Sequence, residues 1–380
     1  MKQVLLGEVT KIQTGKIDVN KAVSGGKYPF FTCSREAYEI DDAPYEGKAV
    51  LVAGNGDLNV KYYEGKFNAY QRTYFLFVND ENVLLPKFLY WFLESYVEKL
   101  RSESIGSTIK YIKMGNLTDA SLTLPSPEMQ IQIVEKLDKA FAEIDSLEKN
   151  LQLKEDKTNQ LLQSILSAAF NDTEEFSMKT IQLKESCDFF GDGDWIESKD
   201  QSDSGIRLIQ TGNVGIGEFK DRIEKARWIS EETFRSLRCT EIIEGDVLVS
   251  RLPDPVGRAC LIPSLSHKAI TAVDCAIIKF NGSKIIPKFF IYYSQSNDYY
   301  SKIQPLISGS TRERISREKL GNLLIPQPTI LEQKVMIQKL DKVFAEIDKL
   351  KNIISIERVQ ISSLRQSILS DAFNFSENAA

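Results

Sequence analysis

The chain has 380 residues, of which 42% are hydrophobic and 27% are charged, and its formal net charge is −5. This is the composition of an ordinary soluble globular protein, and the length predicts two or three domains. No apolar run approaches the roughly 18 residues that a membrane span needs, so we expect a cytoplasmic chain without membrane association. Five cysteines without CxxC spacing favour neither a disulfide framework nor a structural zinc site, and no metal is expected.

The first globular domain is predicted to span residues 1–127. The apolar runs GKAVLVA (47–53) and TYFLFV (73–78) are each followed by turn residues, and both are predicted to be buried strands. Pro86 is expected to begin a helix with aromatic and aliphatic residues on its inner side. A short strand then leads to Pro125, where a proline-rich junction ends the domain.

A helix of about 40 residues is predicted over 128–171, where it forms a central spacer. The segment from Glu128 to Phe170 contains neither proline nor glycine, so nothing interrupts it. At 1.5 Å per residue such a helix is about 60 Å long. Its apolar residues recur at three- and four-residue steps, which predicts one narrow stripe made of Val134, Leu137, Phe141, Ile144, Leu151, Leu162 and Ile165.

The second globular domain is predicted over 172–328 and repeats the plan of the first with little sequence identity. Strands are expected at 246–250 and 275–280, and Pro287 is expected to begin an aromatic-rich helix. A second long helix is predicted over 329–380, with the stripe Ile337, Leu340, Phe344, Ile347, Ile354, Ile361 and Ile368.

Three motifs recur at a constant offset of 203 positions. LDKAFAEID at 137–145 returns as LDKVFAEID at 340–348, and QSILSAAFN at 163–171 returns as QSILSDAFN at 366–374. Gly-Ser-Thr at 106–108 also returns at 309–311. The segments between these motifs differ in sequence between the two copies but keep the same length. This indicates an internal duplication built on rigid helices.

The two stripes are predicted to bury each other in an intramolecular antiparallel coiled coil. The stripe is imperfect, which predicts a stutter or a second partner surface at the charged positions Glu148, Glu155, Lys351 and Arg358. The predicted fold class is therefore α+β, with two pseudo-symmetric mixed α/β domains joined by two long antiparallel coiled-coil helices.

Charge is divided unevenly along the chain. Residues 172–204 carry 3 basic and 10 acidic side chains, whereas 205–320 carry 18 basic and 13 acidic ones. A net charge of −5 disfavours a nucleic-acid partner, but the surplus in the second domain restores that possibility. The surplus is modest, so either the basic residues gather on one face or a partner supplies further contacts.

The two long helices are nearly identical in sequence, whereas the two domains diverge. This suggests that the helices are a shared scaffold and that each domain binds a different target. On the motifs LDKxFAEID and QSILxxAF after proline-rich junctions, the whole chain resembles the specificity subunit of a Type I restriction-modification system. The resemblance implies that each domain is a target-recognition domain for one half of a split, asymmetric site in double-stranded DNA. It also implies that the helices set the gap between the halves and dock two adenine-N6 methyltransferase subunits. Restriction/translocase subunits would join through these, and the cofactor S-adenosylmethionine would belong to the methyltransferase alone.

Motifs for catalysis are weak or missing, so we predict a chain that is not an enzyme and has no catalytic residues. Phe189 to Gly193 matches an FxGxG pattern, but no DPPY- or NPPF-like motif follows. His267 is the only histidine, and there is no GxxxxGK[ST] segment. Two alternatives remain open at this point: a catalytic methyltransferase or nuclease, and a coiled-coil scaffold that does not touch DNA.

Candidate contact residues follow from the chemistry of base recognition. Forked or amide side chains recognise base edges, arginine on guanine and asparagine or glutamine on adenine. Loop positions of this kind, for each of which a turn or surface role is the alternative, are Asn55, Asn59, Tyr70, Gln71, Arg72, Lys110 and Tyr111 in the first domain and Gln210, Asn213, Arg251, Arg258, Arg312 and Arg314 in the second. On the helices, matched polar positions without a core reason to match predict a duplicated docking surface at Lys139 and Lys342 and at Glu143 and Glu346.

Overall fold

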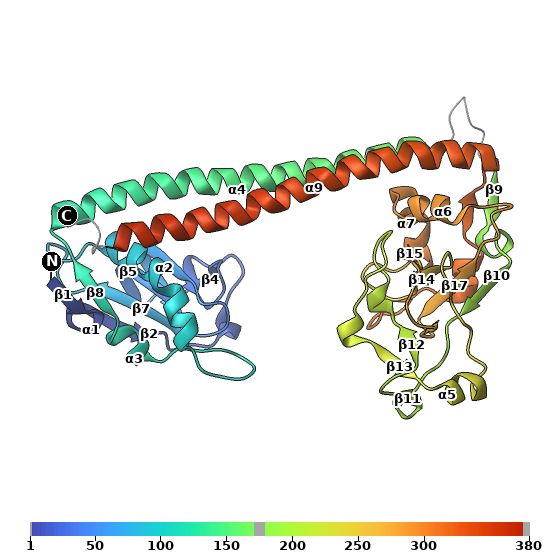
Figure 1. Cartoon of the computed structure of the whole chain (residues 1–380). Helices are drawn as coiled ribbons and strands as arrows, with labels where there is room; N and C mark the ends of the chain where they lie inside the picture. The colour runs from blue at the N-terminus through green and yellow to red at the C-terminus, as the bar shows by residue number, and fades with distance from the viewer. Residues whose placement is uncertain (1, 171–178, 375–380) are drawn as a thin grey trace. The chain divides into compact units, whose positions relative to one another are not determined.

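The computed structural model describes residues 2–170 and 179–374. The chain divides into two compact units, Met1–Leu153 with Ile354–Ala380 (unit 1) and Lys154–Ile353 (unit 2). Two long helices, α4 (Pro127–Phe170) and α9 (Ile330–Phe373), each contribute one part to each unit (Figure 1). The predicted domain boundary at residue 171 lies outside the described residues.

Unit 1 is built on a six-stranded sheet with the order β2-β7-β5-β6-β3-β4. Its neighbouring strands are antiparallel except β3 and β6, and β1 and β8 form a separate pair. The elements are β1 (Lys2–Leu5), α1 (Leu6–Val9), β2 (Thr10–Thr14), the 3-10 helix η1 (Val19–Lys21), β3 (Tyr28–Phe31), β4 (Tyr38–Ile40), β5 (Tyr45–Ala53), β6 (Val60–Ala69), β7 (Thr73–Val78), α2 (Pro86–Glu103), α3 (Met114–Thr118) and β8 (Ser121–Leu124). The predicted strands correspond to β5 and β7, and the helix predicted from Pro86 is α2.

The second half of strand β5, residues 49–53, has a continuous apolar sequence because both of its faces are buried. Val50 and Val52 lie in a cluster with residues of α2 and α4. Ala49 and Leu51 point to the opposite face, where an aromatic cluster includes Phe67. Successive side chains of a strand alternate between faces, so two separate cores require apolar residues at every position.

Gln130 attaches α4 to the domain of unit 1. It is fully buried, and its amide oxygen accepts a hydrogen bond from the backbone N–H of Leu85 at 2.8 Å. Its amide nitrogen donates to the carbonyl oxygens of Val83 at 2.8 Å and Pro125 at 3.0 Å. One side chain thus satisfies two backbone groups just before α2 and one just before α4, which fixes α4 against the start of α2.

Unit 2 contains two four-stranded sheets, β10-β17-β14-β15 and β11-β13-β12-β16, and the pair β18-β9. The elements are β9 (Thr180–Gln182), η2 (Leu183–Glu185), β10 (Phe189–Asp192), η3 (Ser198–Asp200), β11 (Gln201–Ser202), β12 (Ile206–Ile209), η4 (Thr211–Asn213), η5 (Ile223–Lys225), β13 (Arg227–Ile229), α5 (Glu231–Ser236), β14 (Val247–Ser250), β15 (Ala259–Leu261), β16 (Ala269–Thr271), β17 (Cys275–Lys279), α6 (Pro287–Tyr293), α7 (Asn297–Ile303), η6 (Gln304–Leu306), α8 (Arg317–Gly321) and β18 (Leu324–Pro326). The predicted strands correspond to β14 and β17, and the helix predicted from Pro287 is α6.

The attachment of the long helix repeats in unit 2 through Gln333, the equivalent of Gln130 at the 203-residue offset. Gln333 is fully buried and accepts a hydrogen bond from the N–H of Ile286 at 2.8 Å. It donates to the carbonyl oxygens of Lys284 and Pro328, both at 2.8 Å. The duplication therefore preserves the junction between domain and helix atom for atom, although the domains themselves differ.

The long helices pack in an antiparallel sense, because the first part of α4 lies with the last part of α9 in unit 1 and the reverse holds in unit 2 (Figure 1). Each helix has 44 residues, and the predictions of an α+β fold and of a coiled coil are confirmed. Neither these helices nor any other helix in the described residues is long and apolar enough to cross a membrane.

The buried stripe departs from the sequence prediction near the helix ends. Leu166 is fully buried and Leu369 is 8% exposed, whereas the predicted Ile165 and Ile368 are only partly buried. At these ends the helices pack into the domain cores rather than only against each other. An α-helix has 3.6 residues per turn, so the buried side drifts by one position once the 3.5-residue seam ends.

Charged residues interrupt the seam in unit 1, as the sequence predicts. Glu148 and Arg358 are both exposed, and a hollow of about 540 Å³ lies beside them. Nearby, Arg365 of α9 holds the two helices together. It pairs with Asp145 at 2.9 Å and lies over the ring of Phe141 at 4.8 Å.

Candidate nucleic-acid interface

A hollow of about 500 Å³ opens in unit 1 where strand β5 ends. We name it the Tyr111 hollow. Its lining comes from the turn after β5, from the β6–β7 turn and β7, and from the segment that leads into α3. The lining residues are Gly54, Gln71, Arg72, Tyr74, Tyr111, Ile112, Lys113 and Met114.

Backbone contacts bring these distant segments together. The N–H of Gly54 donates to the carbonyl of Arg72 at 2.8 Å, and the N–H of Ile112 donates to the carbonyl of Gly54 at 2.9 Å. A Cβ atom on Gly54 would lie 2.3 Å from the Arg72 carbonyl oxygen, so only glycine permits this approach. Asn55 forms an isolated β-bridge with Tyr111. The structure thus gathers Asn55, Gln71, Arg72 and Tyr111, which the sequence predicted as separate candidates.

The rim of the Tyr111 hollow is positively charged. Arg72, Lys110 and Lys113 are exposed, and none of the three forms an ion pair within the described residues. The side-chain amide of Gln71 makes one long hydrogen bond, 3.4 Å, to the carboxylate of Asp18, its only side-chain hydrogen bond with the described residues. Uncompensated cations beside an amide and a phenol are suited to phosphate and base contacts.

Two predicted residues of the first domain lie elsewhere. Asn59 is 7% exposed, and its amide nitrogen donates to the carbonyls of Cys33 at 3.0 Å and Asp57 at 2.7 Å. Its oxygen accepts from Lys61 at 2.5 Å, and burial lowers the pKa of that lysine to about 8. Tyr70 is half-buried and donates its backbone N–H to Phe31 at 2.9 Å. Asn59 is therefore engaged within the domain.

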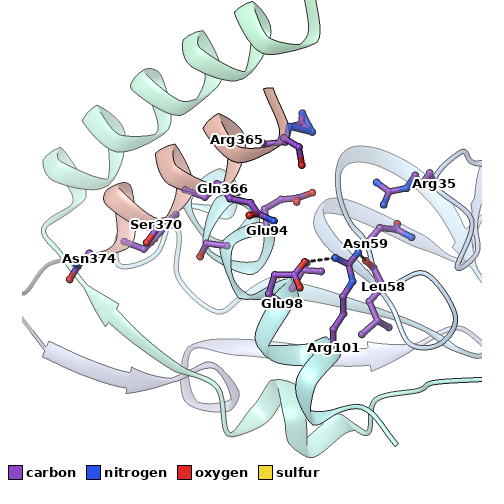
Figure 2. Close-up of a pocket in the computed structure, with 15 residues that line it drawn as sticks. Arg35, Leu58, Asn59, Glu94, Glu98, Arg101, Arg365, Gln366, Ser370 and Asn374 are labelled. Carbon is purple, nitrogen blue, oxygen red and sulfur yellow. Dashed lines mark hydrogen bonds and ion pairs between the residues drawn. The ribbon is translucent and has the colours of Figure 1, made fainter. Parts of the chain in front are cut away.

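A larger hollow of about 700 Å³ lies between α2 and the last part of α9, and Asn59 is on its wall (Figure 2). Arg101 pairs with Glu98 and with Asp57, the latter at 3.2 Å. Arg35 also pairs with Asp57, at 2.8 Å. Carboxylates engage these cations, so this hollow suits a phosphate less well than the Tyr111 hollow does.

Arg258 in unit 2 has an interior position. It is 7% exposed, and its guanidinium donates to the carbonyls of Val214 at 2.7 Å, Leu252 at 2.7 Å, Pro255 at 3.0 Å and Thr211 at 2.8 Å. Burial lowers the pKa of Arg258. These contacts tie two loops together, and they give this arginine a structural role.

Arg251 and Asn213 are also largely buried. Arg251 follows β14, is 4% exposed, donates to Val273 at 2.6 Å and pairs with Asp192 at 3.1 Å. Asn213 is 8% exposed and closes the turn around it by bonds to Gln210 and Lys220. Gln210 itself is half-buried.

Arg312 and Arg314 are the accessible candidates of unit 2. The side chain of Arg312 is 70% exposed and pairs with Asp274 at 3.5 Å. Arg314 is exposed, and its side chain forms no ion pair with the described residues. Both belong to the loop that follows Gly309, the counterpart of the segment that carries Lys110 and Tyr111.

Lys113 is the one residue of the Tyr111 hollow's positive rim that the sequence prediction missed. No local sequence pattern identifies it, because residues 112–113 belong to no helix or strand whose periodicity would indicate the direction of the side chain. The proposed docking residues Lys139, Glu143, Lys342 and Glu346 are all exposed on the long helices, and Glu346 pairs with Lys349 at 2.7 Å. Within 2–170 and 179–374, no group of three or more His, Cys, Asp or Glu residues has an arrangement that could hold a metal ion.

Comparison with known proteins covers nearly the whole chain. A family model described as "Type I restriction modification DNA specificity domain" matches residues 1–155 and 176–358. The Type I restriction enzyme EcoDI specificity subunit of Escherichia coli is 29% identical over 398 residues, which cover 98% of this chain and 87% of that protein. The EcoBI specificity subunit of the same species is 23% identical over 319 residues, covering 77% of this chain and 66% of that protein.

A solved structure shows the same fold. It is described as "Structural basis underlying complex assembly and conformational transition of the type I R-M system", and its matching chain superposes with a TM-score of 0.72 at 19% identity. The match covers 98% of this chain and 97% of the other. The family model and the curated relatives confirm the resemblance inferred from the repeated helix motifs, and the solved structure confirms the fold. Because the family model matches both domains, this chain belongs to the family of Type I restriction-modification DNA specificity subunits.

Proposed function

We propose that this chain recognises a bipartite, asymmetric site in double-stranded DNA and that each domain contacts one half. The observation that carries the proposal is the Tyr111 hollow, where the uncompensated cations Arg72 and Lys113 line the wall together with Gln71 and Tyr111. The exposed Lys110 precedes Tyr111 in the chain. Lysines of this kind bind the DNA backbone, whereas arginine and amide side chains can also discriminate bases.

The two domains carry different residues at structurally equivalent positions, which supports two different half-sites. The position after the core strand is Gly54 in unit 1 and Arg251 in unit 2, and each carbonyl accepts a hydrogen bond from the chain after the Gly-Ser-Thr segment. The position of Tyr111 is taken by Arg314 in the second domain. Equivalent places therefore present different chemistry, as two distinct base sequences require.

The long helices would set the gap between half-sites and dock two methyltransferase subunits. α4 continues without a break from unit 1 into unit 2, and a helix converts residue number into length. The matched exposed pairs on α4 and α9 provide two equivalent surfaces, one for each methyltransferase. S-adenosylmethionine would be held by the methyltransferase, and restriction/translocase subunits would join the complex through it.

A binding experiment on the complex of this chain with its methyltransferase subunit tests the proposal. The methylated motif is first determined by sequencing modified adenines in cells that carry both proteins. Arg72→Ala and Arg314→Ala are then compared, with the exposed Lys21→Ala as a control. Each arginine variant should lose roughly 5- to 100-fold affinity for the cognate duplex, the range of one or two base contacts.

The two variants should relax different halves of the motif. Relaxation of the same half, or unchanged binding by both variants, would contradict the assignment of one half-site to each domain. A wild-type complex that binds cognate and unrelated duplexes equally would instead favour a scaffold that does not recognise DNA sequence.

A further inference from the structure

The Gly-Ser-Thr segments form the same exposed loop in both domains. The first loop runs from Ile105 to Tyr111 and the second from Ser308 to Arg314. In each loop the two end residues exchange a pair of backbone hydrogen bonds, 3.0 and 2.9 Å in the first and 2.9 Å twice in the second. We name these the Gly-Ser-Thr loops. Duplication has preserved their geometry in full, although the domains that carry them have diverged.

The backbone conformation of each loop explains why its first conserved residue is glycine. Gly106 has φ +113° and Gly309 has φ +104°, a region that side chains rarely adopt. A Cβ atom would lie 2.3 Å from the carbonyl oxygen of Ile109 in the first loop and 2.4 Å from that of Arg312 in the second. Backbone geometry therefore accounts for the glycines.

No backbone constraint or contact among the described residues explains the serine and threonine that follow. Ser107 and Thr108 in the first loop and Ser310 and Thr311 in the second are all exposed. Their hydroxyls form no hydrogen bond with the described residues, and they contribute nothing to a core. Four hydroxyls that match between two diverged loops without an internal contact indicate an external ligand that is the same for both domains.

The next positions of the loops differ between the domains. Ile109 and Tyr111 in the first loop correspond to Arg312 and Arg314 in the second. Half-sites of different sequence require different side chains at positions that contact bases. A contact shared by both half-sites must involve what all DNA has in common, the sugar-phosphate backbone.

Cations beside both loops favour a phosphate over a surface of the methyltransferase. Lys110 and Lys113 accompany the first loop, and Arg314 lies in the second, all without an ion pair in the described part of the chain. Serine and threonine hydroxyls are frequent donors to phosphate oxygens in DNA complexes, and nearby positive charge strengthens such bonds.

We propose that the Ser-Thr hydroxyls of each Gly-Ser-Thr loop donate hydrogen bonds to a backbone phosphate in the half-site of their own domain. The two contacts are equivalent and independent of base sequence. They place each domain on the duplex, while the differing neighbours select bases. This inference rests on the proposed function and assigns a positioning role to four residues whose hydroxyls form no hydrogen bond within the described part of the chain.

The test uses the full chain in complex with its methyltransferase subunit. Ser107→Ala/Thr108→Ala, Ser310→Ala/Thr311→Ala and the combined variant are measured by fluorescence anisotropy on a cognate duplex and on an unrelated duplex. Each pair should weaken binding to both duplexes by the same factor, roughly three- to tenfold, so the specificity ratio stays constant. The conservative exchange Ser107→Thr/Thr108→Ser should keep the affinity within about twofold, because the hydroxyls remain.

Matched controls are Ser121→Ala in unit 1 and Ser264→Ala in unit 2, which remove exposed hydroxyls outside the loops. Neither should change DNA affinity. A scan with uncharged methylphosphonate linkages locates the contact: one linkage in each half should weaken the wild type but scarcely weaken the variant of the corresponding loop.

Three results would overturn the inference. They are unchanged affinity of the combined variant, a loss confined to the cognate duplex, and loss of the methyltransferase from the purified complex. The last would make the loops a protein-docking surface. Failure of the proposed function has a different signature, because the wild-type complex would then bind both duplexes equally before any loop is altered.

Discussion

At the scale of single residues, two glutamines carry the attachment of the domains to the helices. Gln130 and Gln333 are fully buried, and each bonds to three backbone groups. Buried amides are retained only where their partners are in place, since an unmatched backbone group costs about 1–3 kcal/mol.

Gln130→Ala should destabilise unit 1 by about 2–4 kcal/mol, because it leaves the N–H of Leu85 and two carbonyls without a partner. Urea unfolding monitored by tryptophan fluorescence measures the loss. The exposed Gln132→Ala two positions away is the control and should shift the midpoint little. Equal stability of both variants would show that the hydrogen bonds of Gln130 are replaced by water.

Asp194 should make the stability of unit 2 depend on pH. Burial raises the pKa of this carboxyl to about 6, although it accepts hydrogen bonds from the N–H of Thr240 at 3.1 and 3.2 Å. Between about pH 4 and pH 6 the carboxyl of Asp194 is protonated in the folded state but ionised in the unfolded state. The free energy of unfolding therefore falls as the pH rises through this range. Asp194→Asn should flatten the fall, as seen in melting temperatures from pH 4 to pH 7. An identical pH profile for variant and wild type would count against it.

At the scale of elements, the continuity of α4 predicts that it measures the distance between half-sites. Four extra helical residues lengthen α4 by about 6 Å, which corresponds to roughly two base pairs at 3.4 Å each. Inserting four helix-forming residues between Lys149 and Lys157 should preserve both half-site sequences and widen the unread spacer by one or two base pairs. Sequencing of methylated adenines in cells with the variant and its methyltransferase provides the measurement.

A four-residue insertion after Gly282, in a bend of unit 2 between the exposed Asn281 and Ser283, is the control and should leave the spacer unchanged. If the α4 insertion keeps full activity on the original spacer, the helix is not what determines the gap.

The same helices carry the predicted docking surfaces. Glu143 and Glu346 are exposed equivalents, so reversing both charges with Glu143→Lys and Glu346→Lys should weaken assembly with two methyltransferase subunits. Folding should survive, because exposed charges contribute little to stability. Native mass spectrometry of the purified complex reports its composition, with Glu36→Lys and Glu244→Lys as controls. A complete complex from the Glu143/Glu346 variant would place docking elsewhere.

At the scale of the whole molecule, duplication predicts that the domains are separable. Exchanging residues 1–124 for the domain of a relative should change one half of the methylated motif and leave the other unchanged. The new domain must still pack on Val134, Leu137 and Phe141 and present backbone partners to Gln130. A change in both halves, or none, would refute the modular interpretation, and a chimera that satisfies Gln130 separates this outcome from misfolding.

The amino-acid sequence by itself determined the frame of this protein. Local signals suffice for it: the absence of Pro and Gly from α4 after its first residue, Pro127, its apolar periodicity, and the repeat of LDKxFAEID at a fixed offset. Strands such as β5 and β7 and helices that begin at Pro86 and Pro287 follow from equally local patterns. Such features depend on neighbours in the chain, so the chain order alone reveals them.

Only the tertiary structure decided which candidate residues are accessible and which gather at one place. Arg258 and Arg312 are indistinguishable by residue type, yet one is 7% exposed and bonds to four carbonyls, whereas the side chain of the other is 70% exposed. Arg72 and Tyr111 meet because Gly54 lets two distant segments approach one strand end. Burial and such encounters depend on contacts between residues far apart in the chain, and no local pattern encodes which segments will meet.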